Sequence, residues 1–238
     1  MKNKLLQQTF SRRTALNHLG AIGAISLLGC EEDTSSSSEA GTMTEAGTMN
    51  MMNRCLETPP QVEGPYYFAL DENRVDMTGG REGAALIMNL MVTDQDCLPV
   101  PNALVEVWHA DAQGVYSGFG GQAENTTGLD FLRGESITDN EGNVQFTSIY
   151  PGWYPGRAVH VHFKVSLADR TLVTSQFYLP DEMSRMVYQT GAYQNRGEQD
   201  TLVERDRFFQ GAGSARELLL ASVEENDSSY LARLQITI

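Results

Sequence analysis

The chain has 238 residues and an ordinary globular composition, with 41% hydrophobic residues and 22 glycines, which is enough to build one sizeable core. Its formal net charge is −14, and all 31 acidic residues lie after residue 29. Such a surface repels phosphate backbones and anionic lipid headgroups. It argues against a nucleic acid as partner and is compatible with a small phenolic substrate.

Residues 1–29 have the pattern of an export signal. A basic start leads to Arg12-Arg13, in a sequence that resembles a twin-arginine signal, and residues 20–29 form an apolar run too short to span a bilayer. The run ends at Cys30 in a sequence that looks like a lipoprotein cleavage site. We expect export to the periplasm or the cell surface with a lipid anchor at Cys30; a plain secretory peptide or an uncleaved anchor is the alternative.

The next segment separates this signal from the folded domain. Residues 30–53 are rich in Ser, Thr, Gly, Met and Glu, and cannot bury enough apolar surface to offset the entropy of ordering, so we predict a flexible tether. The domain then occupies residues 54–238. In an oxidising compartment its two cysteines, Cys55 and Cys97, are expected to form a disulfide; two unpaired buried thiols are the alternative.

Short apolar segments bounded by Gly, Pro, Asn and Asp fill most of the domain. They predict strands at 85–92, 103–108, 160–165, 172–178 and 230–238, and a hairpin of 136–138 with 143–146 around the turn 139–142. Short helices are expected at 181–188, where a cap is expected, and at 215–222. The pattern predicts an all-β fold, an antiparallel β-sandwich with few short helices, and no Gly-rich phosphate loop supports nucleotide binding.

A pair of histidines gives the first chemical signal. His160 and His162 are two residues apart in a predicted strand, so their side chains project from the same face and can converge on one point. Imidazole pairs at this spacing often bind metals, but strand histidines without a metal are also frequent. The remaining histidine of the domain, His109, lies at a strand end, where we expect a structural or surface role.

Two tyrosines strengthen the metal interpretation. Tyr154 lies in a run of turn-forming residues, 150–157, directly before the histidine strand, and Tyr116 follows the strand that ends at Trp108. A trivalent iron would hold a phenol as phenolate, a hard anionic donor that favours Fe(III). The alternative is that both tyrosines pack in the core or at turns.

Four segments resemble the intradiol ring-cleavage dioxygenases, especially the protocatechuate and hydroxyquinol type and their exported relatives. The most specific one, 150–163, reads Tyr-Pro-Gly-Trp-Tyr-Pro-Gly-Arg-Ala-Val-His-Val-His-Phe. The other three are 58–67, 101–118 and 174–182. Together they extend over nearly all of residues 54–238. The N-terminal helical linker domain of the catechol 1,2-cleaving members is not visible, which puts the usual dimerisation mode in doubt and leaves the oligomeric state open.

The resemblance implies one Fe(III) per site, with Tyr116, Tyr154, His160 and His162 as its ligands. It also implies that Tyr154 leaves the iron when substrate binds and accepts a substrate proton. Arg157 would stabilise negative charge on the substrate and Gln176 would help to orient it.

The implied reaction inserts both atoms of O2 into a catechol-type aromatic and gives a cis,cis-muconate-type diacid. The alternatives are a non-catalytic transthyretin-like β-sandwich that binds ligands on the cell surface, and an Fe(II) enzyme with histidine and carboxylate ligands, for which no acid is suitably spaced from the histidine pair. The sequence does not name the catechol.

Overall fold

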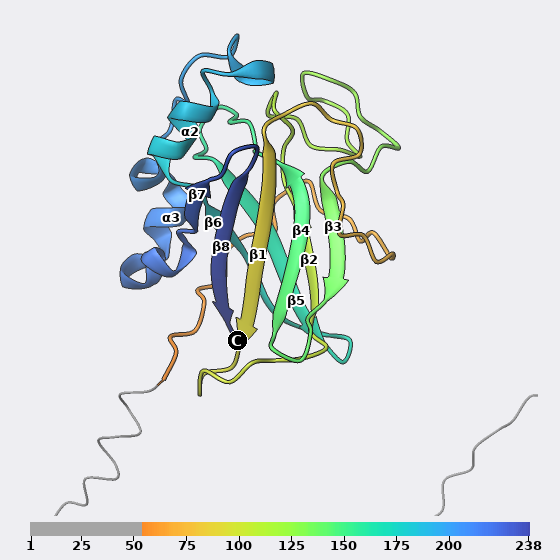
Figure 1. Cartoon of the computed structure of the whole chain (residues 1–238), viewed down its shortest axis with the longest axis vertical. Helices are drawn as coiled ribbons and strands as arrows, with labels where there is room; N and C mark the ends of the chain where they lie inside the picture. The colour runs from red at the N-terminus through yellow and green to blue at the C-terminus, as the bar shows by residue number, and fades with distance from the viewer. Residues whose placement is uncertain (1–53) are drawn as a thin grey trace, which may run out of the picture. The chain divides into compact units, whose positions relative to one another are not determined.

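Alternating apolar and polar residues build two β-sheets that pack face to face in residues 54–238, the part of the chain that the computed structural model describes (Figure 1). The first sheet has the strand order β4-β1-β8-β7 and the second β3-β2-β5-β6. The strands are β1 (Ala85–Thr93), β2 (Leu104–Trp108), β3 (Arg133–Ile137), β4 (Asn143–Ile149), β5 (His160–Leu167), β6 (Arg170–Tyr178), β7 (Ser222–Glu225) and β8 (Tyr230–Thr237).

The predicted all-β sandwich is confirmed, with one departure from a purely antiparallel arrangement. β1 and β8 run parallel, whereas every other named pair is antiparallel. One apolar core fills the space between the sheets: Met88 and Leu90 of β1 belong to the same buried cluster as Val107 of β2 and Phe163 of β5. The alternation of apolar and polar residues that predicted the strands therefore arises because one face of each sheet packs on the core.

The predicted hairpin at 136–146 is wrong, because β3 and β4 belong to different sheets. Thr138 donates its backbone N–H to Ala103 beside the second sheet, while the carbonyl of Gly142 accepts from Val92 of the first. Asp139 holds the turn between them by accepting the N–H groups of Glu141 and Asn143. The four-residue turn thus carries the chain from one sheet to the other, and the local pattern cannot distinguish this from a hairpin.

Helices are short and lie at one side of the sandwich near β6 and β7 (Figure 1). They are α2 (Asp181–Val187), α3 (Arg207–Gly211) and the 3₁₀ segments η1 (Gly191–Tyr193), η2 (Val203–Arg205) and η3 (Gly213–Leu219). The helix expected at 181–188 forms, but Pro180 at its N-cap offers no side-chain cap. The helix expected at 215–222 is wrong in type and extent, since η3 ends at Leu219 and β7 begins at Ser222.

A disulfide joins Cys55 to Cys97, as predicted, with 5.2 Å between their Cα atoms. It ties the start of residues 54–68, which we call the N-terminal arm, to the turn between β1 and β2. The arm then follows the edge of the second sheet, where the N–H of Gln61 donates to the carbonyl of Thr174 in β6. The disulfide therefore fixes the start of the N-terminal arm, which runs along the edge of the second sheet.

Reduction of this disulfide is expected to lower the free energy of unfolding by about 2–4 kcal/mol, because it closes a loop with a sequence separation of 42 residues. Thermal unfolding with and without reductant measures the effect. A variant with both Cys55→Ser and Cys97→Ser serves as control, and its midpoint should not respond to reductant. Equal midpoints for the native protein in both conditions would contradict the stabilising role.

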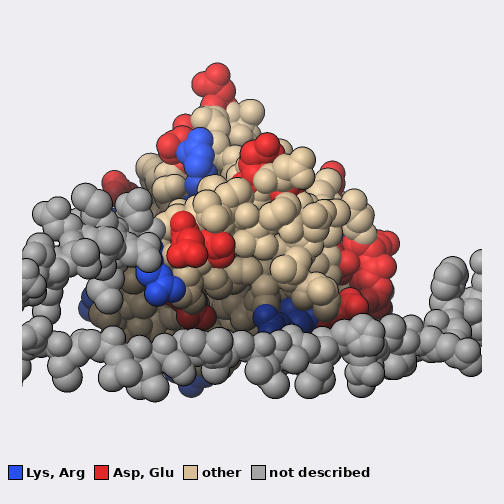
Figure 2. Space-filling model, turned by 90° about the horizontal axis from the view of Figure 1, so that it is seen from below, with Lys and Arg blue, Asp and Glu red and all other residues tan. Residues whose placement is uncertain are grey.

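The surface seen in Figure 2 carries acidic groups and small, separate groups of Lys and Arg among uncharged residues, without one continuous basic patch on that face. No helix within residues 54–238 has the length and apolar character needed to cross a membrane. The predicted export signal, the lipid anchor at Cys30 and the tether at 30–53 lie outside the described residues and stay predictions.

Candidate functional site

Four side chains in register cross the second sheet on the face turned away from the sandwich core. Arg133 of β3 pairs with Trp108 of β2. Trp108 also pairs with His162 of β5, which in turn pairs with Gln176 of β6. Alternate residues such as Val107 point into the core cluster. The sheet therefore gives the histidine strand a rigid support on both sides, and the Trp108 and His162 rings stack at 5.1 Å between centroids.

His160 shares this face with His162, as the strand spacing predicts, and their ring centroids are 4.9 Å apart. The Nδ1 atom of His160 lies 2.6 Å from the carbonyl oxygen of Ala158, so Nδ1 must carry the proton and donate it. Consequently the lone pair of Nε2 is free to face outward from the strand. This tautomer is the one that a metal-binding imidazole requires.

Both predicted tyrosines reach that nitrogen. The phenol oxygen of Tyr116 is 3.2 Å from His160 Nε2, and that of Tyr154 is 3.1 Å from the same atom. The ring of Tyr116 also lies edge-on to His162, with 6.0 Å between centroids. The structure thus brings together the four side chains that were proposed as iron ligands, from three separate parts of the chain.

The loops that present the tyrosines are tied to each other by close backbone contacts. Gly152 donates its N–H to the carbonyl of Asp111, and a Cβ on Gly152 would lie 2.3 Å from the carbonyl oxygen of Ala112. Only glycine permits this approach. The carboxylate of Asp111 accepts the N–H groups of Gln113 and Val115, which shapes the turn before Tyr116.

Burial controls the protonation of these groups when no cation is present. It raises the pKa of Tyr116 well above the ordinary value, and the neighbouring Tyr154 adds to the shift. Burial also lowers the pKa of His160 and His162 well below the ordinary value; positive charge on Arg157 adds to this at both, and His160 adds to it at His162. The site therefore favours neutral phenols and neutral imidazoles, which are the forms that a bound cation would meet.

The donor set fits a ferric ion. Tyr116, His160 and His162 are each at most 3% exposed, and Nδ1 of His162 is buried without a hydrogen-bond partner. A highly charged cation would convert the buried phenols to phenolates and reverse the effect of burial on their pKa. Two phenolate oxygens would be hard donors of the kind that Fe(III) prefers, and imidazole nitrogens also bind iron. Within residues 54–238, no group of three or more His, Cys, Asp and Glu side chains is arranged to hold a metal ion.

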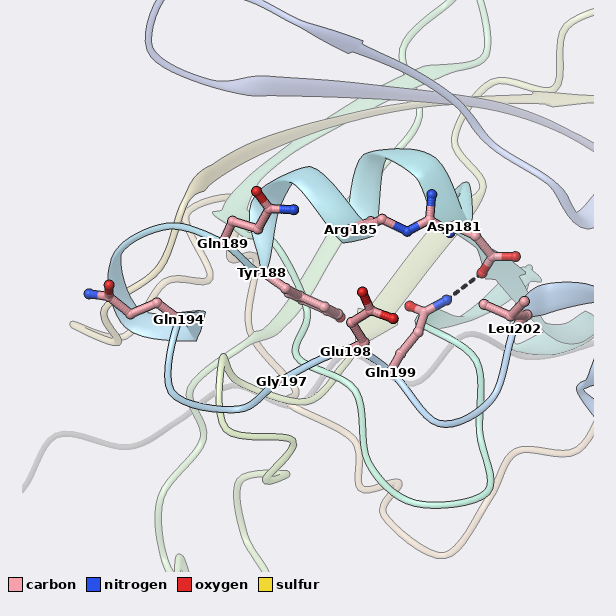
Figure 3. A pocket seen from close by; sticks show the side chains of 9 residues that line it. All are labelled: Asp181, Arg185, Tyr188, Gln189, Gln194, Gly197, Glu198, Gln199 and Leu202. Atoms are coloured by element: carbon pink, nitrogen blue, oxygen red, sulfur yellow. Dashed lines mark hydrogen bonds between the residues drawn. The ribbon is translucent and has the colours of Figure 1, made fainter.

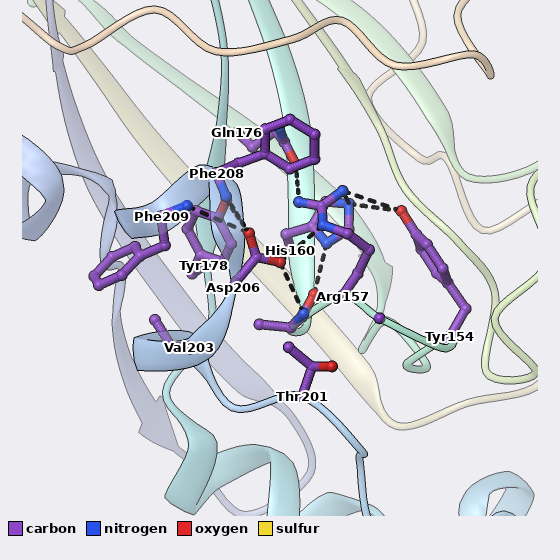
Figure 4. Close-up of polar contacts among 12 residues, drawn as sticks. Tyr154, Arg157, His160, Gln176, Tyr178, Thr201, Val203, Asp206, Phe208 and Phe209 are labelled. Atoms are coloured by element: carbon purple, nitrogen blue, oxygen red, sulfur yellow. Dashed lines mark hydrogen bonds and ion pairs between the residues drawn. The ribbon is translucent and has the colours of Figure 1, made fainter. Parts of the chain in front are cut away.

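Arg157 and Gln176, whose roles the family resemblance implied, lie beside His160 and Tyr154 (Figure 4). The Nη2 of Arg157 donates to Gln176 Oε1 at 2.6 Å, and its Nη1 lies 3.4 Å from both the Tyr154 phenol oxygen and His160 Nε2. A guanidinium is thus held directly next to the proposed ligands. Such a fixed cation is suited to stabilise negative charge that develops on a bound molecule.

Comparison with known proteins identifies the family of the chain. A family model described as Dioxygenase matches residues 62–218. The solved structure of an intradiol ring-cleavage dioxygenase from Tetranychus urticae superposes with a TM-score of 0.71 at 25% identity, and the match covers 77% of this chain and 95% of that one. The chain belongs to the intradiol ring-cleavage dioxygenase family.

Curated relatives of this family are similar over shorter stretches. Catechol 1,2-dioxygenase 1 of Acinetobacter lwoffii is 30% identical over 167 residues, covering 59% of this chain and 51% of that protein. The protocatechuate 3,4-dioxygenase beta chain of Burkholderia cepacia is 35% identical over 129 residues, covering 50% and 54% respectively. The chain therefore spans about half the length of these curated relatives. Because the matched proteins are named as enzymes, the alternative of a non-catalytic binding module is not favoured.

In this family member the N-terminal arm covers the candidate metal site. Tyr66 stacks on Tyr116 with 4.7 Å between ring centroids, and the carbonyl of Val62 accepts from Gln176 Nε2 at 3.4 Å. Gly64 has a φ of +80°, and a Cβ there would lie 3.2 Å from Cε1 of His162. The positive φ favours glycine at this position, and any larger side chain would press against the His162 ring.

His109 has the structural role that we expected. Its Nδ1 donates to the carbonyl of Ala110 at 2.8 Å, so its Nε2 accepts from the Ser148 hydroxyl at 2.7 Å. Burial lowers the pKa of His109 to about 4, so it stays neutral near neutral pH. Both ring nitrogens have partners, Nδ1 at the next residue and Nε2 at Ser148 of β4, which leaves none for a metal.

Sequence reasoning did not find Asp206, which forms an ion pair with Arg157 across 49 positions of sequence, with 2.8 Å between Nε and Oδ2. No helix was predicted at 207–211, and an acid before a short helix would indicate only an N-cap. The Asp206 carboxylate reaches Arg157 only because the segment after α2 packs against β5 and β6. The local sequence does not reveal this packing.

A cavity in the described residues lies apart from this site (Figure 3). It has a volume of about 410 Å³, is bounded by α2 and the segment 194–202, and includes Asp181, Arg185 and Glu198 in its walls. None of the six predicted site residues lines it. This cavity is therefore separate from the tyrosine and histidine cluster. The candidate site is assigned from the chemistry of that cluster and not from the presence of a cavity.

Proposed function

We propose that this chain is an Fe(III)-dependent intradiol dioxygenase. It breaks the carbon–carbon bond between the two hydroxyl-bearing carbons of a catechol-type aromatic and adds both atoms of one O2 molecule. The product is a cis,cis-muconate-type diacid, so no external reductant is consumed. The named relatives act on catechol, hydroxyquinol, chlorocatechol and protocatechuate, which supports a catechol-type substrate for this family member.

The observation that supports iron most strongly is the convergence of two phenol oxygens on one imidazole nitrogen. Tyr116 and Tyr154 approach His160 Nε2 within 3.2 Å and 3.1 Å, and His162 adjoins them with Nδ1 unpartnered. When bound there, ferric iron would act as a Lewis acid that holds both substrate oxygens and makes the aromatic ring reactive towards O2. Tyr116, Tyr154, His160 and His162 are the residues that would hold it.

The two tyrosines are not equivalent. Tyr116 is fully enclosed and stacks under Tyr66, whereas Tyr154 is only half-buried. The Arg157 cation counteracts the effect of burial on the pKa of Tyr154, which is raised to a lesser degree than that of Tyr116. We therefore assign to Tyr154 the movable role, in which its phenolate oxygen takes a proton from an entering substrate hydroxyl.

Arg157 and Gln176 would act on the substrate itself. The Nη1 of Arg157 is directed at the space between Tyr154 and His160, where a substrate oxygen would carry negative charge. Gln176 accepts from Arg157 and donates to the carbonyl of Val62 on the arm. It thus links the charge-stabilising group to the segment that closes the site and excludes water.

Colour tests the metal part of the proposal. Iron bound by tyrosinate absorbs visible light, so the purified protein should be reddish and contain close to one iron per chain. Anaerobic addition of catechol should shift the band, because substrate displaces Tyr154. A protein that stays colourless and iron-free after reconstitution with ferric iron would refute the assignment.

We also propose that the enzyme is exported and lipid-anchored at Cys30. The support is the order of a basic start, Arg12-Arg13, a short apolar run and a cysteine in residues 1–30. Labelled fatty acid should be incorporated into the wild-type protein in a bacterial host and not into Cys30→Ser. Equal labelling of both would exclude Cys30 as the anchor.

A further inference from the structure

Asp206 is a fully buried carboxylate that the proposed reaction does not use directly. It lies between η2 and α3 and is 0% exposed. Five groups surround it (Figure 4). Oδ2 accepts from Arg157 Nε at 2.8 Å and from the N–H of Ala158 at 3.0 Å. Oδ1 accepts from the N–H groups of Phe208 and Phe209 at 2.9 and 3.3 Å, and from the Tyr178 hydroxyl at 3.2 Å.

This environment keeps Asp206 ionised. Burial alone would raise its pKa, but the Arg157 cation, the hydrogen bond from Arg157 and the backbone N–H groups outweigh burial and lower the pKa below the ordinary value. A buried carboxylate is stable only when paired and fully hydrogen-bonded, and both oxygens meet this requirement here. Asp206 is therefore a fixed negative charge beside Arg157.

The contact determines how the guanidinium is turned. Nε is bound to Asp206, and the other two nitrogens have different partners: Nη2 meets Gln176, and Nη1 meets Tyr154 and His160. The Phe208 ring lies 4.5 Å from the guanidinium carbon and covers its face. Asp206 at the start of α3 thus contacts the edge of the Arg157 guanidinium, and Phe208 of α3 covers its face. Together they hold the guanidinium in one orientation.

We propose that Asp206 is a positioning residue of this enzyme, whose carboxylate holds Arg157 with Nη1 directed at the substrate position and Nη2 at Gln176. The inference rests on the proposed function, in which Arg157 stabilises charge on the substrate. Asp206 itself touches neither the metal ligands nor the substrate position. Its contribution passes through Arg157, so it should be lost when Arg157 is absent.

Asp206→Asn separates positioning from folding. Asn accepts the N–H groups of Phe208 and Phe209 as well as Asp does at an N-cap, so α3 keeps its start while the charge is removed. We expect kcat/KM for catechol to fall about 10- to 100-fold, the usual scale for groups that orient an active-site residue. Iron content and the tyrosinate colour should stay at the wild-type level, because no metal ligand is touched.

A double-mutant cycle distinguishes positioning from a merely structural role. In an Arg157→Met background, Asp206→Asn should lower kcat/KM by no more than about twofold, since the group through which it acts is gone. Asp181→Asn is the matched control: Asp181 also accepts a backbone N–H, from Val203, and a side-chain amide, from Gln199, away from the metal cluster. It should leave kcat/KM unchanged.

Wild-type kcat/KM in Asp206→Asn, or a full additional loss in the Arg157→Met background, would overturn the proposal. A crystal structure of Asp206→Asn gives a readout independent of turnover, in which Arg157 should have left the position beside Tyr154; an unmoved Arg157 would also overturn it. If the Asn variant does not fold, Asp206→Ser, which keeps an N-cap acceptor, takes its place with the same expectations. Failure of the proposed function can be told apart from failure of this inference, because in the first case the wild-type protein would not cleave catechol at all.

Discussion

Tyr116→Phe is expected to reduce iron-dependent cleavage of catechol by more than about 100-fold. Loss of a group that only orients a metal ligand typically costs 10- to 100-fold, and Tyr116 is proposed as a ligand itself. The change removes one buried oxygen and leaves the ring, which continues to stack on Tyr66. The fold should therefore persist while iron content and the visible band decrease.

Turnover, iron content and thermal unfolding are measured together for this variant. Tyr230→Phe is the matched control. Tyr230 lies in β8 of the first sheet, away from the candidate site, and its hydroxyl donates to the exposed side chain of Glu225. It should retain wild-type colour and activity. His162→Ala should behave like Tyr116→Phe. Full activity with full iron content in either ligand variant would show that the ligand assignment is wrong.

Arg157→Lys is expected to lower kcat/KM about 10²- to 10³-fold while iron stays bound. Each of the three guanidinium nitrogens of Arg157 has a partner: Nε contacts Asp206, Nη2 contacts Gln176 and Nη1 faces Tyr154. A lysine has one ammonium group and cannot reproduce this fork, although its charge is the same. The loss of one fixed charge-stabilising donor in an active site has this magnitude.

Arg207→Lys is the control for this experiment, because Arg207 also lies 4.5 Å from the Phe208 ring but is exposed and makes no contact with the candidate ligands. Its kcat/KM should equal that of the wild type. Steady-state kinetics of both variants at equal iron content measures the difference. Equal losses in the two arginine variants would mean that the fork geometry of Arg157 has no special role.

The elements that the sequence predicts well are those set by local chemistry. Strand alternation placed β1, β5 and β6 within a few residues of their observed bounds, and the two-residue spacing of His160 and His162 correctly put both rings on one face. These features need no knowledge of distant parts of the chain. Tyr116 and Tyr154 were candidates because of their positions in turns near the predicted strands, and the family resemblance implied that they are ligands.

The features that could not be predicted depend on tertiary packing. The segments around the turn 139–142 look like a hairpin, yet their hydrogen-bond partners lie on opposite sheets. Asp206 looks like an ordinary helix cap, and only the packing of α3 beside β5 and β6 brings it to Arg157. In both cases the local pattern is compatible with several partners, and the fold selects one of them.

Oxygen incorporation tests the central claim most directly. Iron-loaded protein is mixed with catechol under ¹⁸O2, and the product is analysed by mass spectrometry. The account predicts a ring-opened cis,cis-diacid that contains two ¹⁸O atoms per molecule, one in each carboxyl group. A product that retains the intact ring, carries an aldehyde, or contains no oxygen from O2 would contradict it.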